Sequence, residues 1–171
     1  CIAVTGGLEV ASDRLLAKMK KGVDIAQVAR VTNVFSKNNI MVHAYLMYGF
    51  PTQTEQETID SLEVVRQLFE RDCIQSAFWH LFTTTVHSPI GKNPQEFGIE
   101  ITGPVFEGFA QNDLYHEDPQ GADHPKYTKG LNLALNDYLN KAGFKRELQN
   151  WFDFPILSTS HSKGLIESFL S

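Results

Sequence analysis

The stretch from His43 to Thr54 constrains the fold of this chain more than any other feature. An apolar run up to Tyr48 indicates a buried strand, and the residues Gly49-Phe50-Pro51 that follow indicate a turn. Pro51 fixes its own φ and cannot continue a central strand. Thr54, with Glu57 three residues later, forms a capping box, which predicts that a helix begins there. In α/β sheets, ligands bind at such carboxyl ends of strands, and a glycine lets the backbone approach a ligand closely.

The same strand–turn–helix order recurs along the first half of the chain. Hydrophobic spacing predicts alternating strands and helices, and this alternation is typical of βαβ units with a parallel sheet. The predicted strands are 1–5, 40–48 and 74–82, and the predicted helices are 12–21, 24–37 and 54–71. Ser12 and Asp24 are the expected helix caps, and Gly22 is the expected left-handed residue after the first helix.

The pattern changes at Thr83. Residues 83–104 and 107–126 are rich in Gly, Pro, Asn and Asp, and we interpret them as ordered loops. A helix is predicted over 126–142, and the aromatic tail 144–171 is expected to pack back on the body. We therefore divide the chain into a first domain, 1–104, and an extension with one helix, 105–171.

Two motifs give the first half a resemblance to a known family. The first motif is Gly-Leu-Glu-x-x-Ser-Asp-Arg-x-Leu-x-x-Met-x-Lys-Gly over residues 7–22, and the second is Tyr-Gly-Phe-Pro over residues 48–51. Together they resemble the C-terminal half of a radical S-adenosylmethionine (SAM) enzyme core, in the branch whose members often carry a cobalamin-binding domain. The resemblance covers about residues 1–100. It implies an α/β fold that is the C-terminal half of a partial (β/α)6 TIM-like barrel.

The resemblance also implies a set of SAM-binding residues. Glu9 would face SAM, and Lys21 would pair with its methionyl carboxylate, as an ammonium group can. Without the resemblance, Glu9 would be a first-turn acid and Lys21 a solvated lysine. The turn would border the adenine, with its backbone on the adenine edge and an aromatic ring on its face. The residues expected at this cofactor site are Glu9, Lys21, Tyr45, Tyr48, Gly49, Phe50 and Pro51.

The segment after the third strand departs from the family pattern. Thr84 and His87 lie in it, and we predict that they contact a small-molecule substrate. An alternative uses the scattered histidines His43, His80 and His87 as ligands of a TIM-barrel-like metal-dependent hydrolase. No His-x-His or Glu-x-x-His pair supports that alternative, so no metal ligand is predicted. A cation site is the alternative for the polar residues at 116–118 and 123–124, which we interpret as solvated loop residues.

The resemblance implies SAM and a [4Fe–4S] cluster as cofactors, and cobalamin as a further candidate. The chain has two cysteines, Cys1 and Cys73, whereas a cluster is held by three or four thiolates. The cluster ligands would therefore lie outside this chain. The chain opens within an apparent strand, so we expect it to be a fragment of a longer parent enzyme and inactive alone. Its first strand would pair with the upstream part of that protein, with a second copy, or with the tail.

Composition excludes several partners. The net charge of −5 offers no basic surface for nucleic acid, and no apolar run approaches the ~20 residues of a membrane span. No basic stretch precedes an apolar core, so a cytoplasmic protein is expected. A non-catalytic α/β interaction domain remains the alternative from another functional class.

Overall fold

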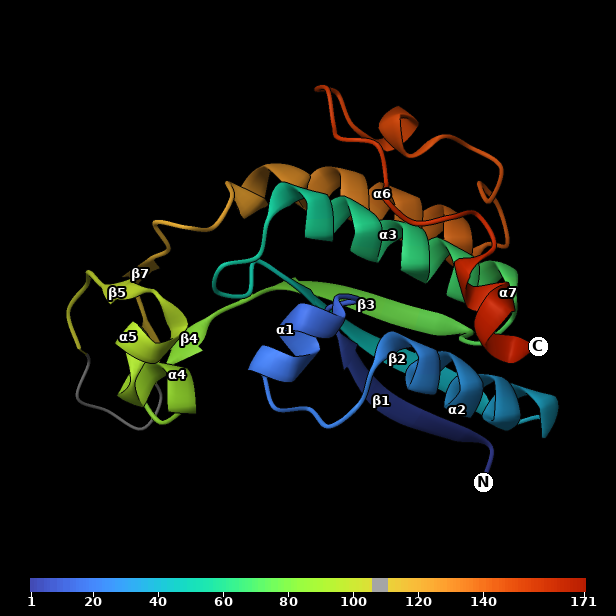
Figure 1. Ribbon diagram of the computed structural model, residues 1–171, viewed down its shortest axis with the longest axis horizontal. Coiled ribbons are helices and arrows are strands. Elements are labelled where there is room, and N and C mark those ends of the chain that lie inside the picture. The colour runs from blue at the N-terminus through green and yellow to red at the C-terminus, as the bar shows by residue number, and fades with distance from the viewer. Residues whose placement is uncertain (106–110) are drawn as a thin grey trace.

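The computed structural model describes residues 1–105 and 111–171, so the part of the predicted extension at 106–110 lies outside the described residues. Three strands form a parallel sheet in the order β1-β2-β3 (Figure 1). Their bounds are Ala3–Glu9 for β1, Met41–Tyr48 for β2 and Ser76–Leu81 for β3. The prediction of parallel strands, adjacent in chain order, is confirmed.

Helices connect the strands as the sequence predicts. Helices α1 (Asp13–Lys18) and α2 (Ile25–Lys37) join β1 to β2, and α3 (Glu55–Glu70) joins β2 to β3. The side chains of Ser12, Asp24 and Thr54 cap the three helices. The first helix ends earlier than predicted because Lys20 has a φ of 56°, a left-handed conformation that a right-handed helix cannot contain.

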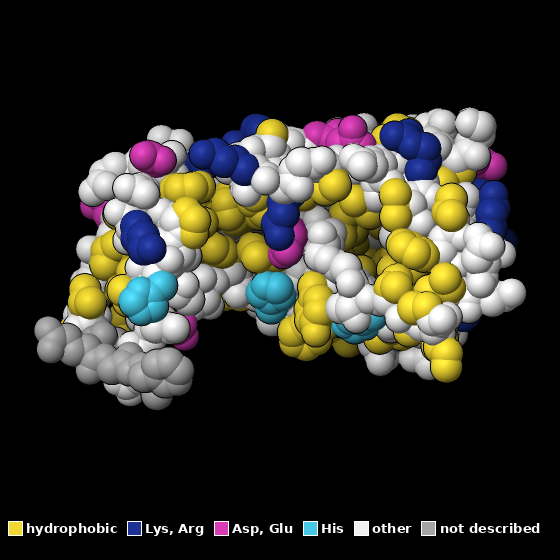
Figure 2. All heavy atoms as spheres, turned by 90° about the horizontal axis from the view of Figure 1, so that it is seen from below, with side chains coloured by type: hydrophobic (Ala, Val, Ile, Leu, Met, Phe, Trp, Pro, Cys, Tyr) yellow, Lys and Arg dark blue, Asp and Glu magenta, His cyan; other side chains and the backbone are white. Residues whose placement is uncertain are grey.

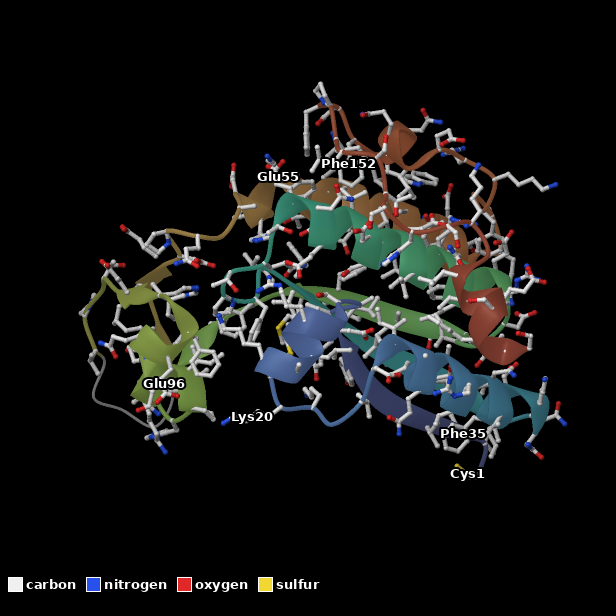
Figure 3. All side chains as sticks on the ribbon, in the orientation of Figure 1. Cys1, Lys20, Phe35, Glu55, Glu96 and Phe152 are labelled. Atoms are coloured by element: carbon white, nitrogen blue, oxygen red, sulfur yellow. The ribbon has the colours of Figure 1, made fainter. Side chains whose placement is uncertain are left out.

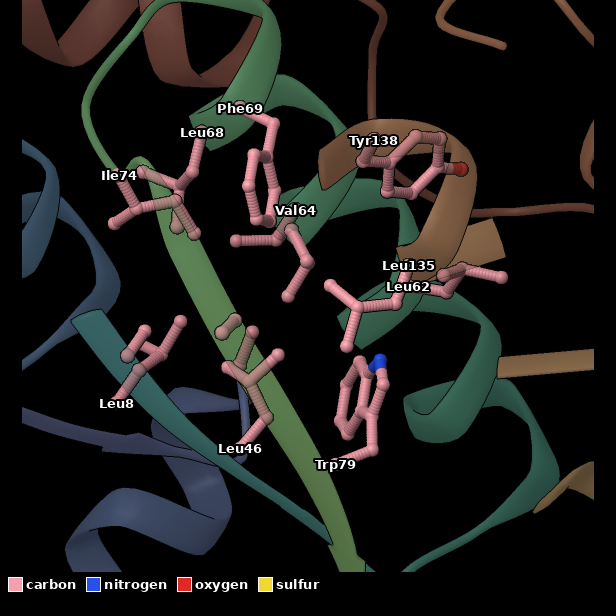
Figure 4. Close-up of a cluster of buried hydrophobic side chains, with 14 of the residues drawn as sticks. Leu8, Leu46, Leu62, Val64, Leu68, Phe69, Ile74, Trp79, Leu135 and Tyr138 are labelled. Atoms are coloured by element: carbon pink, nitrogen blue, oxygen red, sulfur yellow. The ribbon is translucent and has the colours of Figure 1, made fainter. Parts of the chain in front are cut away.

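The core lies between one face of the sheet and the helices. Alternate residues of β2 point to that face, and Trp79 of β3 joins them there (Figure 4). Helix α6 (Thr128–Leu139) lies beside α3 over the sheet (Figure 1), and α7 (Leu165–Leu170) packs against α2 and α3. The buried β2 residues are Val42, Ala44, Leu46 and Tyr48.

The opposite face of the sheet is exposed. Tyr45 of β2 and its β3 neighbour Phe78 are 47% and 56% exposed. Seen from below, hydrophobic and histidine side chains reach the surface in several places (Figure 2). The described residues thus form a mixed α/β fold with a three-stranded parallel sheet and seven α-helices, four of which, α2, α3, α6 and α7, pack on one side of the sheet.

The segment after β3 is more regular than predicted. It contains the helices α4 (Pro89–Lys92) and α5 (Pro94–Phe97), and two antiparallel strand pairs. Strand β4 (Thr84–Thr85) pairs with β6 (Asp113–Leu114), and β5 (Glu100–Ile101) pairs with β7 (His116–Glu117). Both pairs join residues on either side of position 104, so residues on the two sides of the predicted domain boundary form common ladders.

The extension packs on the body, as expected, but the prediction of one helix in it is wrong. It holds both α6 and α7, and the 3-10 turns His124–Tyr127 and Leu148–Trp151. Trp151 and Phe152 are buried in the main core. Helix α7 was missed because it has only six residues and no side-chain cap, so its sequence carries little helical periodicity.

Candidate functional site at the carboxyl ends of the strands

The carboxyl ends of the three strands meet at one edge of the sheet because the strands are parallel. A cavity of about 500 Å³ opens there, which we call the strand-end cavity. Helix α1 and the segment carrying α4 and α5 form its two sides. Its lining residues are Glu9, Lys18, Met19, Lys20, Lys21, Met47, Phe50, Ser88, Pro89, Ile90, Asn93, Glu96 and Phe97.

Glu9 reaches this cavity through an irregularity at the end of β1. The pairing register with β2 shifts between Gly7 and Glu9, which is a β-bulge, and Glu9 has a φ of 60°. Such bulges re-aim a side chain, and left-handed non-glycine residues concentrate at functional sites. The Glu9 carboxylate folds back over Gly7: a Cβ on Gly7 would lie 2.4 Å from Glu9 Oε1. Gly7 therefore provides the space for this carboxylate.

Lys21 meets Glu9 at the cavity rim. Lys21 Nζ lies 2.7 Å from Glu9 Oε1, so the two residues that sequence analysis singled out twelve positions apart form an ion pair. The Glu9 side chain is 14% exposed and that of Lys21 is 39% exposed. The pair presents one carboxylate and one ammonium group side by side at the mouth of the cavity.

Apolar side chains form another part of the cavity lining. Phe50 packs edge-to-face with Phe82 and Phe97, at centroid distances of 5.4 and 6.4 Å. Ile90 of α4 belongs to the same buried cluster, and Met47 packs against it. Lys20 extends from the end of α1 into the space between α1 and the segment that carries Glu96 (Figure 3). The cavity thus has a charged mouth and an aromatic wall.

The Gly-Phe-Pro turn is closed by its own hydrogen bonds. Gly49 has a φ of 80°, which favours glycine, and Pro51 is buried. The backbone N–H groups of Gly49 and Phe50 both donate to Gln53 Oε1, at 2.8 and 3.1 Å. These two amides are therefore occupied, and what the turn offers to the cavity is the ring of Phe50.

The two tyrosines of β2 point to opposite faces of the sheet. Tyr48 is buried on the helix side, where its hydroxyl lies 2.8 Å from Thr128 Oγ1. Tyr45 is exposed on the open face and packs edge-to-face on His43. Neither residue lines the strand-end cavity, although both were predicted at the cofactor site. Phe50, which follows the end of β2 in the turn, does line it.

Of the two predicted substrate contacts, neither lines the cavity. Thr84 is fully buried, and its hydroxyl lies 3.2 Å from His116 Nδ1 in the β4 region. His87 is exposed, and the residues that follow it, Ser88 and Pro89, reach the cavity instead.

The residues that hold α1 to the turn were not predicted from the sequence. Arg14 donates to both carboxylate oxygens of Glu57, at 2.8 and 2.7 Å, and also to the carbonyl oxygen of Thr52. Burial alone would raise the pKa of Glu57, but hydrogen bonds from Arg14, Thr54 and Ser12 outweigh it and hold that pKa at about 2. The capping box was visible in the sequence, whereas the long-range partner Arg14 gave no local signal.

The residues of the loops before α6 are not all solvated, and that interpretation is wrong for His124, which is buried. His124 is 5% exposed, and Asp118 accepts hydrogen bonds from the backbone of Gly121 and Thr52.

Within residues 1–105 and 111–171, no group of three or more His, Cys, Asp or Glu side chains is placed to hold a metal ion. His43 lies 2.7 Å from Ser76 Oγ through its Nδ1.

The two thiols do not suit an iron–sulfur cluster. Cys1 and Cys73 both precede strands, so they lie at the amino end of the sheet, away from the strand-end cavity. Figure 3 shows Cys1 beside the N-terminus, far from Lys20. Burial raises the pKa of the Cys73 thiol to about 11, whereas a cluster ligand is a thiolate. These residues provide no cluster site.

A second cavity, of about 300 Å³, runs along β1, and we call it the edge groove. It is bordered by β1 residues 4–8 and by one side of α2, including Val28, Val31 and Phe35. The outer edge of β1 pairs with no strand among the described residues. An unpaired strand edge beside an apolar groove has the features of a site for strand addition.

No protein-family model matches this chain, and no curated protein matches its sequence. In the part of the chain that the structure describes, no helix combines the length and the apolar character needed to cross a membrane.

Proposed function

We propose that this chain is the C-terminal half of a radical SAM enzyme barrel and that its strand-end cavity binds the amino-acid end of SAM. The observation that carries the proposal is the Glu9–Lys21 pair at the mouth of that cavity, with 2.7 Å between Oε1 and Nζ. The methionyl group of SAM carries one ammonium and one carboxylate. Opposite charges fixed side by side complement such a zwitterion, with Glu9 facing the ammonium and Lys21 facing the carboxylate.

The apolar wall supports the same assignment. Phe50 and Phe97 offer ring faces and edges to a planar group, and Met47 and Ile90 offer an aliphatic surface to the sulfonium arm. We place the adenine against Phe50 rather than on the backbone of the turn, because Gln53 already accepts the amides of Gly49 and Phe50. Tyr48, Tyr45, Thr84 and His87 have no role in this version of the site.

The cluster belongs to another part of the enzyme in this proposal. A [4Fe–4S] cluster held by the upstream part would supply the electron for reductive cleavage of SAM. The residues of this chain bind and orient SAM and exclude water from it. No described residue is assigned to cobalamin.

The upstream partner would complete the sheet. The edge groove and the unpaired edge of β1 suit a parallel strand with a helix over it, which would continue the βαβ order. The uncovered sheet face, with Tyr45 and Phe78 exposed, would then line the interior of a partial barrel. A dimer formed through the same edge is the alternative occupant.

Isothermal titration of SAM into the full-length protein tests the proposal. Glu9→Gln and Lys21→Met should each weaken binding by about 1.5–3 kcal/mol, the scale of a hydrogen bond to a charged group. Lys37→Met is the matched control, because Lys37 ends α2 at the opposite end of the sheet. This variant should bind SAM with the affinity of the wild type. Unchanged affinity in both site variants would leave the interaction-domain alternative in place.

A further inference from the structure

One buried side chain holds the turn that follows β2. Gln53 has no exposed surface, and its Oε1 accepts the backbone N–H groups of Gly49 at 2.8 Å and Phe50 at 3.1 Å. Its own backbone N–H donates to the carbonyl oxygen of Phe50 at 2.8 Å. Three hydrogen bonds therefore connect Gln53 to the two residues between the end of the strand and Pro51.

Gln53 is in turn fixed by a histidine from the distant 3-10 turn His124–Tyr127. His124 Nε2 lies 3.0 Å from the carbonyl oxygen of Gln53, and His124 Nδ1 lies 3.3 Å from Thr58 Oγ1. Gln53 Nε2 donates to the same Thr58 oxygen at 3.2 Å, which closes a ring of three buried side chains. A Cβ placed on Gly49 would lie 3.4 Å from His124 Cβ, so the histidine packs directly against the turn.

This ring determines where the aromatic wall of the strand-end cavity stands. Phe50 is the residue of the turn that lines the cavity; the residue is 3% exposed, and its ring packs against those of Phe82 and Phe97. Its backbone is held on one side by β2 and on the other by Gln53. If the two amides lost their acceptor, they would be buried without partners, and the turn would rearrange to satisfy them.

We propose that Gln53 and His124 are positioning residues of the strand-end cavity, which hold the Gly49–Phe50 turn so that Phe50 can contact the bound ligand. This inference rests on the proposed function for the identity of that ligand, the adenine end of SAM. It adds two residues that touch no ligand themselves, one of them 71 positions along the chain from the other.

The ring makes the site sensitive to acid. With Nε2–H donating to the Gln53 carbonyl, the Nδ1 of a neutral His124 can accept a proton from the Thr58 hydroxyl, which also lies 3.2 Å from the Thr54 carbonyl oxygen, whereas the Nδ1 of a protonated His124 cannot accept. Burial lowers the pKa of His124 below its ordinary value of 6.5, and the Gln53 carbonyl oxygen only partly offsets this. The folded ring thus favours the neutral form and weakens as the pH falls below that value. The carboxylates facing His124 are those of Asp118, Asp123 and Glu55, the last also paired with Lys126.

Amide hydrogen exchange and SAM titration of the full-length protein test the inference together. Gln53→Met removes the acceptor at nearly constant volume, and it should speed exchange at Gly49 and Phe50 and weaken SAM binding about tenfold. Gln53→Glu keeps an acceptor oxygen and should restore both protection and affinity. The inference predicts that the wild type loses affinity as the pH falls from 7.5 to 5.5, and His124→Gln, which keeps a donor that does not titrate, should abolish that loss.

The exchange rates and the SAM affinity each test the proposed role of Gln53. Wild-type protection at Gly49 and Phe50 in Gln53→Met overturns the inference, because Gln53 would then not hold the turn. Faster exchange with unchanged SAM affinity also overturns it, because the turn would then not position the ligand. If the wild-type protein bound no SAM, the proposed function would fail, whereas the exchange rates would still show whether Gln53 and His124 hold the turn.

Discussion

Replacement of Gly7 by alanine should move the Glu9 carboxylate without disturbing the fold. A Cβ at Gly7 would lie 2.4 Å from Glu9 Oε1, closer than a Cβ approaches a non-bonded atom, and 3.2 Å from Glu9 Cδ, which is a tight contact. The atoms in its way belong to the flexible end of one side chain, so the carboxylate moves and the strand stays. Gly6→Ala is the matched control, because a Cβ there would meet nothing within 4 Å.

The expected changes in stability and in SAM affinity follow from loss of the Glu9–Lys21 pair. The Glu9–Lys21 pair is partly exposed, so its loss should change the free energy of unfolding by less than about 1 kcal/mol. Loss of a charged hydrogen bond to the ligand is larger, about 1.5–3 kcal/mol, or roughly 10- to 150-fold in Kd. Gly7→Ala should therefore weaken SAM binding by that factor while its unfolding midpoint stays close to that of Gly6→Ala.

Calorimetric titration of SAM and thermal unfolding of both variants measure the two quantities. If Gly7→Ala bound SAM as tightly as Gly6→Ala, the folded-back position of Glu9 would be irrelevant to binding. If both variants lost affinity equally, the cause would lie in strand flexibility and not in the space over Gly7.

Three further predictions concern the elements around the site. Glu57 has a pKa of about 2, below its ordinary value of 4.5. The stability that its ionised form contributes above pH 5 should therefore fall by about 1–2 kcal/mol as the pH drops towards 2. Glu57→Gln should reduce this loss in acid-unfolding curves. Gly49→Ala should destabilise the protein by about 1–3 kcal/mol more in urea unfolding than Gly22→Ala, since both need a positive φ but only Gly49 is crowded. Cys73→Ala should cost about 1–2 kcal/mol of stability yet leave the iron content of the full-length protein unchanged.

The sequence predicted those parts of the fold that local chemistry determines. The strands 40–48 and 74–82 and the capped helix after Thr54 carry strong periodicity and turn signals, and the structure confirms them within two residues. The four-residue helices α4 and α5 and the two-residue strand pairs escaped prediction, because elements this short have no measurable period. They exist through contacts with residues far away in the chain.

In the candidate site, too, the residues with a local sequence signal were predicted, and those that depend on distant contacts were not. Glu9, Lys21 and Phe50 were each placed at the cofactor site by the family resemblance, and all three line the cavity, but the ion pair between Glu9 and Lys21 was not predicted. Tyr48 and Thr84 were assigned to the site but are buried elsewhere, since a motif gives a residue's neighbours and not the direction of its side chain. His124 contributes from 71 residues away, and no local pattern relates it to Gln53.

A crystal structure of the full-length protein with SAM tests the central claim most directly. The account predicts a parallel strand paired with the free edge of β1, and SAM in the strand-end cavity. The methionyl ammonium should lie within hydrogen-bonding distance of Glu9, the carboxylate within that distance of Lys21, and the adenine against Phe50. SAM bound away from these three residues, or a β1 edge paired with an antiparallel strand, would contradict it.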